Sequence, residues 1–186
     1  FCLRSAQRGG ESKIVSATEI HNVIRHERPD LLEVLYAPFN LDWRGEEPEG
    51  EQPWYQLPMF SWADGMIASR FTSLAYFRSV DRYGAELALT PDQAEALDLV
   101  QEIAHRPGMA VAMSFEEGDM QFLNNHVMLH AREAFEDHAD PKLKRHLLRM
   151  WIAYPPVLRQ PLSPLLADRY RYVEMGGIPA KPQRST

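Results

Sequence analysis

The chain has 186 residues, enough for one sizeable hydrophobic core but few for two. Its 45% hydrophobic and 25% charged residues are typical of a globular protein. The formal net charge of −6 argues against nucleic acids and anionic membrane surfaces as partners, because both bind basic faces. No apolar run reaches the roughly 18–20 residues of a membrane span, and one cysteine, Cys2, excludes an internal disulfide and fits a cytoplasmic protein.

The N-terminal part predicts two strands and two helices. Residues 1–3 read as the tail of a strand, and without an initiator Met they suggest that the chain begins within a larger protein. A turn at Arg8-Gly9-Gly10 should precede a strand over 11–15, with Ser12 and Ile14 on one face. Ser16 and Glu19 have the spacing of a capping box, which predicts a helix of roughly ten residues.

The middle of the chain is less regular. We expect Asp30 to cap a short helix over 31–36, and the Pro-, Gly- and acid-rich residues 38–53 to form a loop. Residues 54–62 and 66–71 should pair as strands across the turn signal Ala63-Asp64-Gly65. The pattern over 72–81 is ambiguous and is compatible with a helix.

The clearest helix signal follows. Thr90, Pro91 and Gln93 combine an N-cap, a proline at the first position and the capping-box partner, and Pro107-Gly108 should end that helix. Short strands are expected after it; they cover 109–115, 120–124, 127–132 and 146–153. The sequence therefore predicts a mainly β fold with flanking helices, either a sandwich or a jelly-roll-like barrel. It would form one domain over 1–186, with an insertion at 29–107 and a proline-rich tail at 155–186.

Two arginines stand out in the last expected strand. On a strand over 145–153, Arg145, Leu147, Arg149 and Trp151 would point to one side. This suits a cavity that holds anions, because a guanidinium matches a carboxylate or sulfonate bidentately. An exposed sheet face with salt-bridged arginines explains the same pattern.

His130 ends another expected strand, behind Asn124 and Asn125. A neutral imidazole there can bind a metal, act as a base or only form hydrogen bonds. His126 lies four residues earlier, which on a strand is roughly 13 Å, too far for both histidines to bind one ion. A zinc hydrolase built on this pair is therefore disfavoured.

Several short motifs resemble, in order, those of the taurine dioxygenase (TauD/TfdA-like) family of Fe(II)- and 2-oxoglutarate-dependent oxygenases, relatives of clavaminate synthase. They are Gly9-Gly10-Glu11-Ser12, Gly118-Asp119, Asn125, His130-Ala131-Arg132, and Arg145 with Arg149. The resemblance covers 1–153 and implies a double-stranded β-helix (jelly-roll) core. Each motif alone is weak, and the ordered set is the signal.

The resemblance also implies roles. His130 corresponds to the distal histidine ligand of iron, and Ser12 and Arg145 to the pair that binds the far carboxylate of the cosubstrate 2-oxoglutarate. Arg149 corresponds to the arginine that holds an anionic substrate group. Asn125 would shape the turn before His130, and Arg132 would be structural near the site. The gap from His130 to Arg145 is slightly long for the family.

In the family, a His-x-Asp/Glu pair that binds the iron lies before the position that corresponds to Ser12. The family's spacing between them is longer than the eleven residues that precede Ser12 in this sequence. The chain therefore resembles the C-terminal two-thirds of an oxygenase, without the N-terminal part of the fold. His138-Ala139-Asp140 matches the His-x-Asp pattern but follows the distal histidine in the sequence, so we interpret the match as a coincidence.

Two functions remain open from the sequence. One is a cytoplasmic dioxygenase that uses Fe(II), 2-oxoglutarate and O2 to hydroxylate a small organic anion, releasing succinate and CO2. The other is a truncated or degenerate binding or partner module without catalysis. The oligomeric state is open too, a homo-oligomer included.

Overall fold

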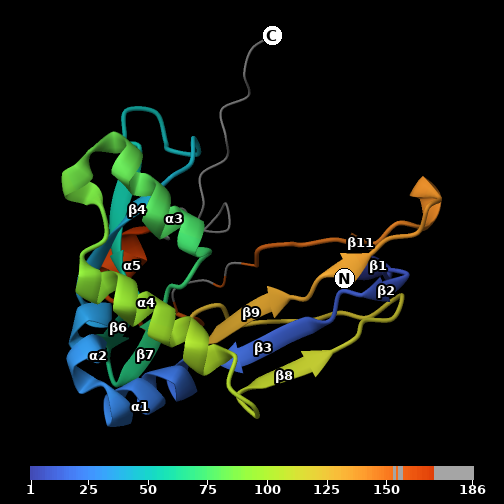
Figure 1. Cartoon of the computed structure of the whole chain (residues 1–186), viewed down its shortest axis with the longest axis horizontal. Helices are drawn as coiled ribbons and strands as arrows, with labels where there is room; N and C mark the ends of the chain where they lie inside the picture. Colours follow the sequence, from blue (N-terminus) through green and yellow to red (C-terminus); the bar gives the residue numbers. More distant parts are fainter. Residues whose placement is uncertain (153, 155–156, 170–186) are drawn as a thin grey trace.

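A computed structural model describes residues 1–152, 154 and 157–169. Figure 1 shows two regions, a lobe rich in helices and an arm of strands that extends from it. The chain starts in the arm, crosses into the lobe over residues 17–104, and returns to the arm after α4 (Pro91–Ala104). Segments far apart in the sequence therefore meet in the arm.

Three helices pack together in the lobe. They are α1 (Ala17–Glu27), α2 (Pro29–Tyr36) and α4. The Ser16 hydroxyl accepts from the Glu19 amide at the start of α1, as its spacing predicts. At α4 both halves of the expected capping box form, between Thr90 and Gln93. Each helix buries one apolar face, for example Ile20 and Ile24 of α1 and Leu97 and Val100 of α4.

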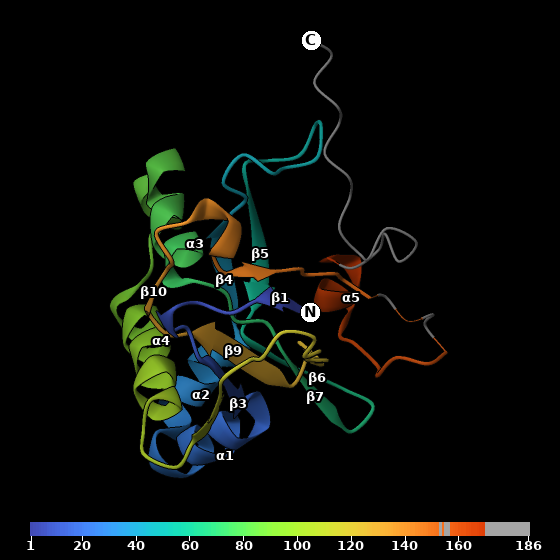
Figure 2. The same ribbon diagram turned by 90° about the vertical axis from the view of Figure 1, so that its right-hand side faces the viewer.

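The lobe also holds two antiparallel strand pairs and smaller helical turns. The pairs are β4 (Pro38–Asp42) with β5 (Trp54–Pro58), and β6 (Phe60–Ala63) with β7 (Met66–Ser69). The helical turns are α3 (Leu74–Arg78), η1 (Ser79–Tyr83) and η2 (Ala85–Leu87). Helix α5 (Pro164–Arg169) packs against β5 (Figure 2), where the Arg169 guanidinium lies 4.3 Å from the centre of the Trp43 ring.

The arm is built around β3. In it β3 (Ser12–Ser16) lies between β8 (Ala110–Met113) and β9 (Met128–Arg132), antiparallel to both. Two short pairs extend the arm, β1 (Cys2–Arg4) with β11 (His146–Leu147) and β2 (Arg8–Gly9) with β10 (Phe135–Glu136). A short helical turn, η3 (Pro141–Leu143), connects β10 to β11.

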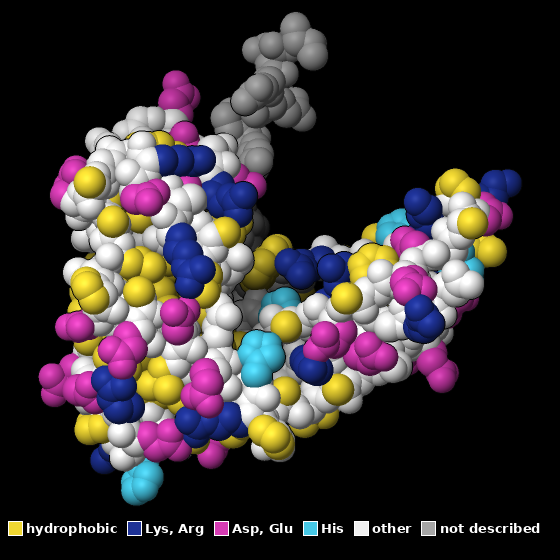
Figure 3. Space-filling view, in the orientation of Figure 1, with side chains coloured by type: hydrophobic (Ala, Val, Ile, Leu, Met, Phe, Trp, Pro, Cys, Tyr) yellow, Lys and Arg dark blue, Asp and Glu magenta, His cyan; other side chains and the backbone are white. Residues whose placement is uncertain are grey.

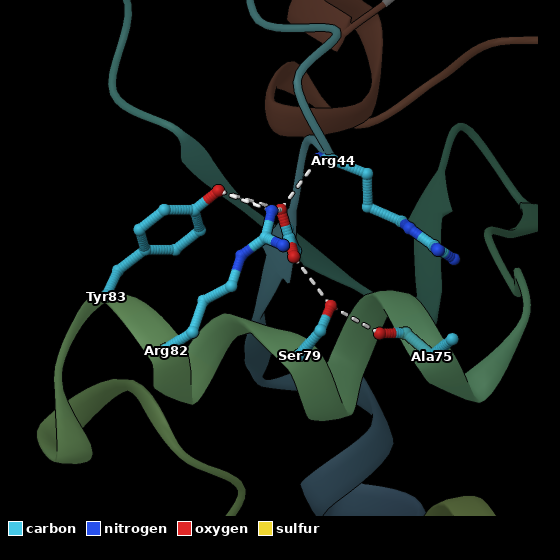
Figure 4. Close-up of polar contacts among 6 residues, drawn as sticks. Arg44, Ala75, Ser79, Arg82 and Tyr83 are labelled. Atoms are coloured by element: carbon cyan, nitrogen blue, oxygen red, sulfur yellow. Dashed lines mark hydrogen bonds and ion pairs between the residues drawn. The ribbon is translucent and has the colours of Figure 1, made fainter.

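A buried carboxylate fixes β4 to η1 (Figure 4). Asp42 is 0% exposed and accepts bonds from the Ser79 hydroxyl at 2.6 Å, the Arg44 amide at 2.6 Å and Arg82 at 2.9 Å. The Tyr83 hydroxyl adds a bond of 3.3 Å. Burial opposes ionisation of this carboxyl, but these hydrogen bonds and the Arg82 charge outweigh it, so the pKa of Asp42 lies below its ordinary value.

Several predicted elements are wrong. Residues 38–42 form strand β4 and not a loop, because Phe39 and Leu41 are buried and pair with β5. Asp30 does not cap α2; that helix starts at Pro29 without a side-chain cap, and Asp30 pairs with Arg28. Residues 120–124 form no strand, since the carbonyl of Asn124 instead accepts the amides of a turn.

The expected strand over 146–153 is also too long. Strand β11 covers only His146 and Leu147, and Leu148 exchanges two backbone hydrogen bonds with Phe1. Ala153 lies outside the described residues, as do 155–156 and 170–186 of the expected tail. Residues 72–81, whose pattern was ambiguous, contain α3 and the start of η1.

Across the described part of the chain, no helix has the length and apolar character needed to cross a membrane.

Candidate active site

Three of the predicted site residues share one face of the β8-β3-β9 sheet. Ser12 pairs with Arg132, and Ile14 pairs with His130, in the antiparallel register of β3 and β9. Partners opposite each other point to the same face, and alternate residues of a strand do too. Ser12, His130 and Arg132 therefore face one way. The opposite face carries Lys13, which forms an ion pair with Glu133.

Arg149 lies close enough to His130 to affect its ionisation. Burial is the main cause that lowers the pKa of His130, and the positive charge of Arg149 lowers it further. The imidazole is therefore neutral near pH 7, which is the state that binds a metal ion. Arg149 falls outside β11, yet its charge still acts on His130. Its role in holding an anionic substrate group stays a prediction.

Arg145 lies beside Phe135 and Gly10 in the arm. Its guanidinium carbon lies 5.3 Å from the centre of the Phe135 ring, and that of Arg132 lies 4.4 Å from the same ring. The Arg145 amide donates to Asp137 at 2.7 Å. A Cβ on Gly10 would lie 3.2 Å from Arg145 Nε, so the glycine leaves room for this side chain. Phe135 thus contacts two guanidinium groups, which the sequence did not predict.

The Ser12 hydroxyl is buried and donates to Gln121 Oε1 at 3.3 Å. Gln121 in turn contacts the Met113 sulfur at 2.9 Å. Ser12 and Arg145 are joined by no direct hydrogen bond in the described structure. No sequence signal indicated the contact between Ser12 and Gln121. If a cosubstrate carboxylate accepted the hydrogen bond of the Ser12 hydroxyl, it would replace Gln121 as the acceptor.

The turn before β9 is held by Asn124. Its carbonyl accepts from Val127 and Met128, and its side-chain oxygen accepts from the His126 amide at 3.0 Å. Asn125 lies in the middle of this turn. The assignment of Asn125 as the residue that shapes the corner stays a prediction.

A metal site needs more ligands than this cluster provides. Within residues 1–152, 154 and 157–169, no group of three or more His, Cys, Asp or Glu side chains could hold a metal ion. The predicted ligand His130 has a lowered pKa, which favours the neutral imidazole, and it lies on the same face as Ser12. These residues fit one ligand position of a non-haem iron site, which takes two histidines and a carboxylate.

Residues 1–151 match the family described as "Taurine catabolism dioxygenase TauD, TfdA family". The chain is 40% identical over 157 residues to FR-33289 synthase from Streptomyces rubellomurinus (strain ATCC 31215), covering 82% of this chain and 45% of the relative. It is 33% identical over 153 residues to the taurine hydroxylase-like protein SAT17 from Stachybotrys chartarum (strain CBS 109288 / IBT 7711), covering 81% and 38%. The chain belongs to the TauD/TfdA family.

The structure is similar to a solved asparagine oxygenase in complex with Fe(II), 2S,3S-3-hydroxyasparagine and succinate. The TM-score is 0.56 at 22% sequence identity, over 78% of this chain and 41% of that chain. This likeness confirms the predicted fold class, a mainly β fold of the jelly-roll oxygenase type with flanking helices. The chain spans less than half the length of these relatives.

Proposed function

We propose that the protein is an Fe(II)- and 2-oxoglutarate-dependent dioxygenase that hydroxylates a small anionic organic substrate, with release of succinate and CO2. The observation that carries the proposal is the shared sheet face of Ser12 and His130, with Arg149 beside His130, in a member of the TauD/TfdA family.

His130 would provide one iron ligand through its neutral imidazole. When bound, the iron supplies the oxygen chemistry that couples decarboxylation of 2-oxoglutarate to hydroxylation of a C–H bond. The side chains of this chain position the reactants. Arg145 would pair with the far carboxylate of 2-oxoglutarate, and Ser12 would donate a hydrogen bond to it.

Arg149 would hold an anionic group of the primary substrate. Its charge beside His130 brings that group close to the iron ligand, which is the arrangement that a positioned hydroxylation needs. The relative SAT17 is described as taurine hydroxylase-like, and taurine carries a sulfonate, which supports an anionic substrate here.

The test is iron-dependent conversion of isotope-labelled 2-oxoglutarate into labelled succinate by the full-length protein. We expect conversion that stops when a chelator removes the metal and resumes when Fe(II) is added back. If 2-oxoglutarate binds but is not converted with any member of a broad panel of small acids, the alternative of a non-catalytic binding module replaces the oxygenase. Absence of 2-oxoglutarate binding would contradict the oxygenase and favour a partner module.

A further inference from the structure

Arg132 of β9 lies next to a predicted cosubstrate residue. It is the direct partner of Ser12 in the register of β9 with β3, and the side chains of such a pair start about 5 Å apart at Cβ on one face of the sheet. The two segments stay together beyond this pair, because the Gly10 amide donates to the Ala134 carbonyl at 3.0 Å. The backbone therefore holds the side chain of Arg132 beside that of Ser12.

One aromatic ring joins Arg132 to Arg145. The guanidinium carbon of Arg132 lies 4.4 Å from the centre of the Phe135 ring, and that of Arg145 lies 5.3 Å from the same centre. The two carbons are therefore no farther apart than these two distances together. A Cβ on Gly10, two residues before Ser12, would lie 3.2 Å from Arg145 Nε. Arg145 thus also approaches the chain segment that carries Ser12.

In the part of the chain that the structure describes, no acidic side chain neutralises Arg132 or Arg145. Figure 3 shows basic and acidic side chains side by side along the arm, yet neither of these guanidinium groups forms an ion pair or a hydrogen bond with a described residue. Glu133, which follows Arg132 in the sequence, pairs with Lys13 on the opposite face of the sheet. Two like charges beside one ring repel each other, so a bound anion would stabilise this arrangement.

The acceptor positions of a carboxylate match these donors. An ionised carboxylate offers about four lone-pair positions, and a bidentate guanidinium occupies two of them. With Arg145 as the bidentate partner and Ser12 as a single donor, one position remains for an N–H group of Arg132. We propose that Arg132 is a further cosubstrate-binding residue, which donates together with Ser12 and Arg145 to the far carboxylate of 2-oxoglutarate. This inference rests on the proposed oxygenase function, because that function supplies the cosubstrate.

Calorimetric titration of the full-length protein tests this role, with Fe(II) present and oxygen excluded so that no turnover occurs. The two probes are 2-oxoglutarate and 2-oxopentanoate, which is the same keto acid with a methyl group in place of the far carboxylate. Arg132→Gln should weaken 2-oxoglutarate binding by about tenfold and leave the affinity for 2-oxopentanoate nearly unchanged. A residue that only supports the fold would weaken the binding of both acids alike.

Arg8→Gln is the matched control, because Arg8 belongs to the same arm but has a 76% exposed side chain that pairs with Glu136. It should change neither affinity. Arg132→Lys retains the charge without the planar fork, so its 2-oxoglutarate affinity should lie between those of the native protein and Arg132→Gln. If Arg132→Gln does not fold by circular dichroism, Arg132→Lys is compared with the native protein on both acids. If 2-oxopentanoate binds too weakly to titrate, the recovery of 2-oxoglutarate affinity in Arg132→Lys carries the test.

Equal losses for the two acids overturn the proposal, as does unchanged 2-oxoglutarate affinity in the folded variants. Absence of recovery in Arg132→Lys does the same where only 2-oxoglutarate can be titrated. Arg145→Ala in the same series separates this result from the proposed function. A loss of affinity in Arg145→Ala without one in Arg132→Gln rejects only the role of Arg132. A native protein that does not bind 2-oxoglutarate rejects the proposed function and this inference with it.

Discussion

At the scale of single residues, Gly10 connects backbone geometry to the predicted cosubstrate site. Its φ of +81° lies in the left-handed region, and a Cβ there would lie 3.2 Å from both Arg145 Nε and Phe135 Cβ. Gly10→Ala should lower the free energy of unfolding by about 1–2 kcal/mol and displace Arg145, so 2-oxoglutarate should bind more weakly. Chemical denaturation and titration of 2-oxoglutarate measure the two effects.

Gly45→Ala is the control for backbone strain. Gly45 has a similar φ of +76°, but a Cβ there would meet nothing within 4 Å. This variant should lose stability without losing 2-oxoglutarate affinity. Equal effects of the two variants on affinity would show that Gly10 does not position Arg145.

Arg145 itself provides the second test at this scale. Arg145→Ala should weaken 2-oxoglutarate binding by about ten- to a hundredfold, because a charged hydrogen-bond partner of the carboxylate is lost. Arg8→Ala removes an arginine of the same arm whose side chain is 76% exposed and pairs with Glu136, so its effect should be small. Fluorescence or calorimetric titration gives both affinities. Normal binding in Arg145→Ala would contradict the assignment.

The sequence was informative where local spacing decides which residues share a strand face. Ser12 with Ile14, and His130 in a strand, follow from alternation alone, and the structure confirms both strands. Gln121 and Phe135 could not be predicted, because Gln121 contacts Ser12 and Phe135 lies beside Gly10 across more than 100 residues of sequence. Contacts of that kind depend on tertiary packing, which has no periodic signature.

At the scale of elements, Asp42 joins β4 to η1 through its buried carboxylate. Asp42→Asn should lower the free energy of unfolding by about 2–3 kcal/mol, because bonds to a charged acceptor are weakened and Arg82 loses its ion partner. The pKa of Asp42 is lowered by folding from about 3.8. Its contribution is therefore present above that value and is lost as the pH falls through the lower pKa of the folded state.

Urea denaturation across the acid range checks this sign. The native protein should lose stability below about pH 4, and Asp42→Asn should lose less over the same interval. Ser61→Ala alters a buried hydroxyl elsewhere in the lobe and should keep the native acid dependence. Parallel pH curves for the native protein and Asp42→Asn would show that Asp42 does not couple folding to pH.

Helices were predicted better than strands, for a physical reason. The caps at Ser16 and Thr90 are local, so their sequence signals correspond directly to hydrogen bonds in the structure. Strand β4 could be predicted only with knowledge of its partner β5. Pro38 and the acid-rich segment after Asp42 indicated a loop, although Phe39 and Leu41 between them are buried. The excess length of the strand expected over 146–153 has the same origin, because its pairing with β1 and Phe1 extends only to Leu148.

At the scale of the whole molecule, the buried core and the predicted site occupy different regions. The buried hydrophobic cluster extends from Val15 through the lobe to Ile103 and includes Leu166 of α5. In the arm, Val111 is 60% exposed and Cys2 is buried apart from that cluster. Local stability follows buried apolar contacts, so the arm should open more readily than the lobe.

Hydrogen exchange measured by mass spectrometry tests this difference. Amides of β8, β9 and β10 should exchange about a hundredfold faster than those of α4 and β4, because arm opening exposes little apolar surface. Ser12, His130 and Arg145 come from separate arm segments. 2-Oxoglutarate bound to Ser12 and Arg145, together with Fe(II) bound to His130, should therefore hold these segments together. Added 2-oxoglutarate with Fe(II) should therefore slow exchange in the arm and leave α4 unchanged. Equal protection of both regions without ligand, or slowing confined to α4, would contradict a site carried by the arm.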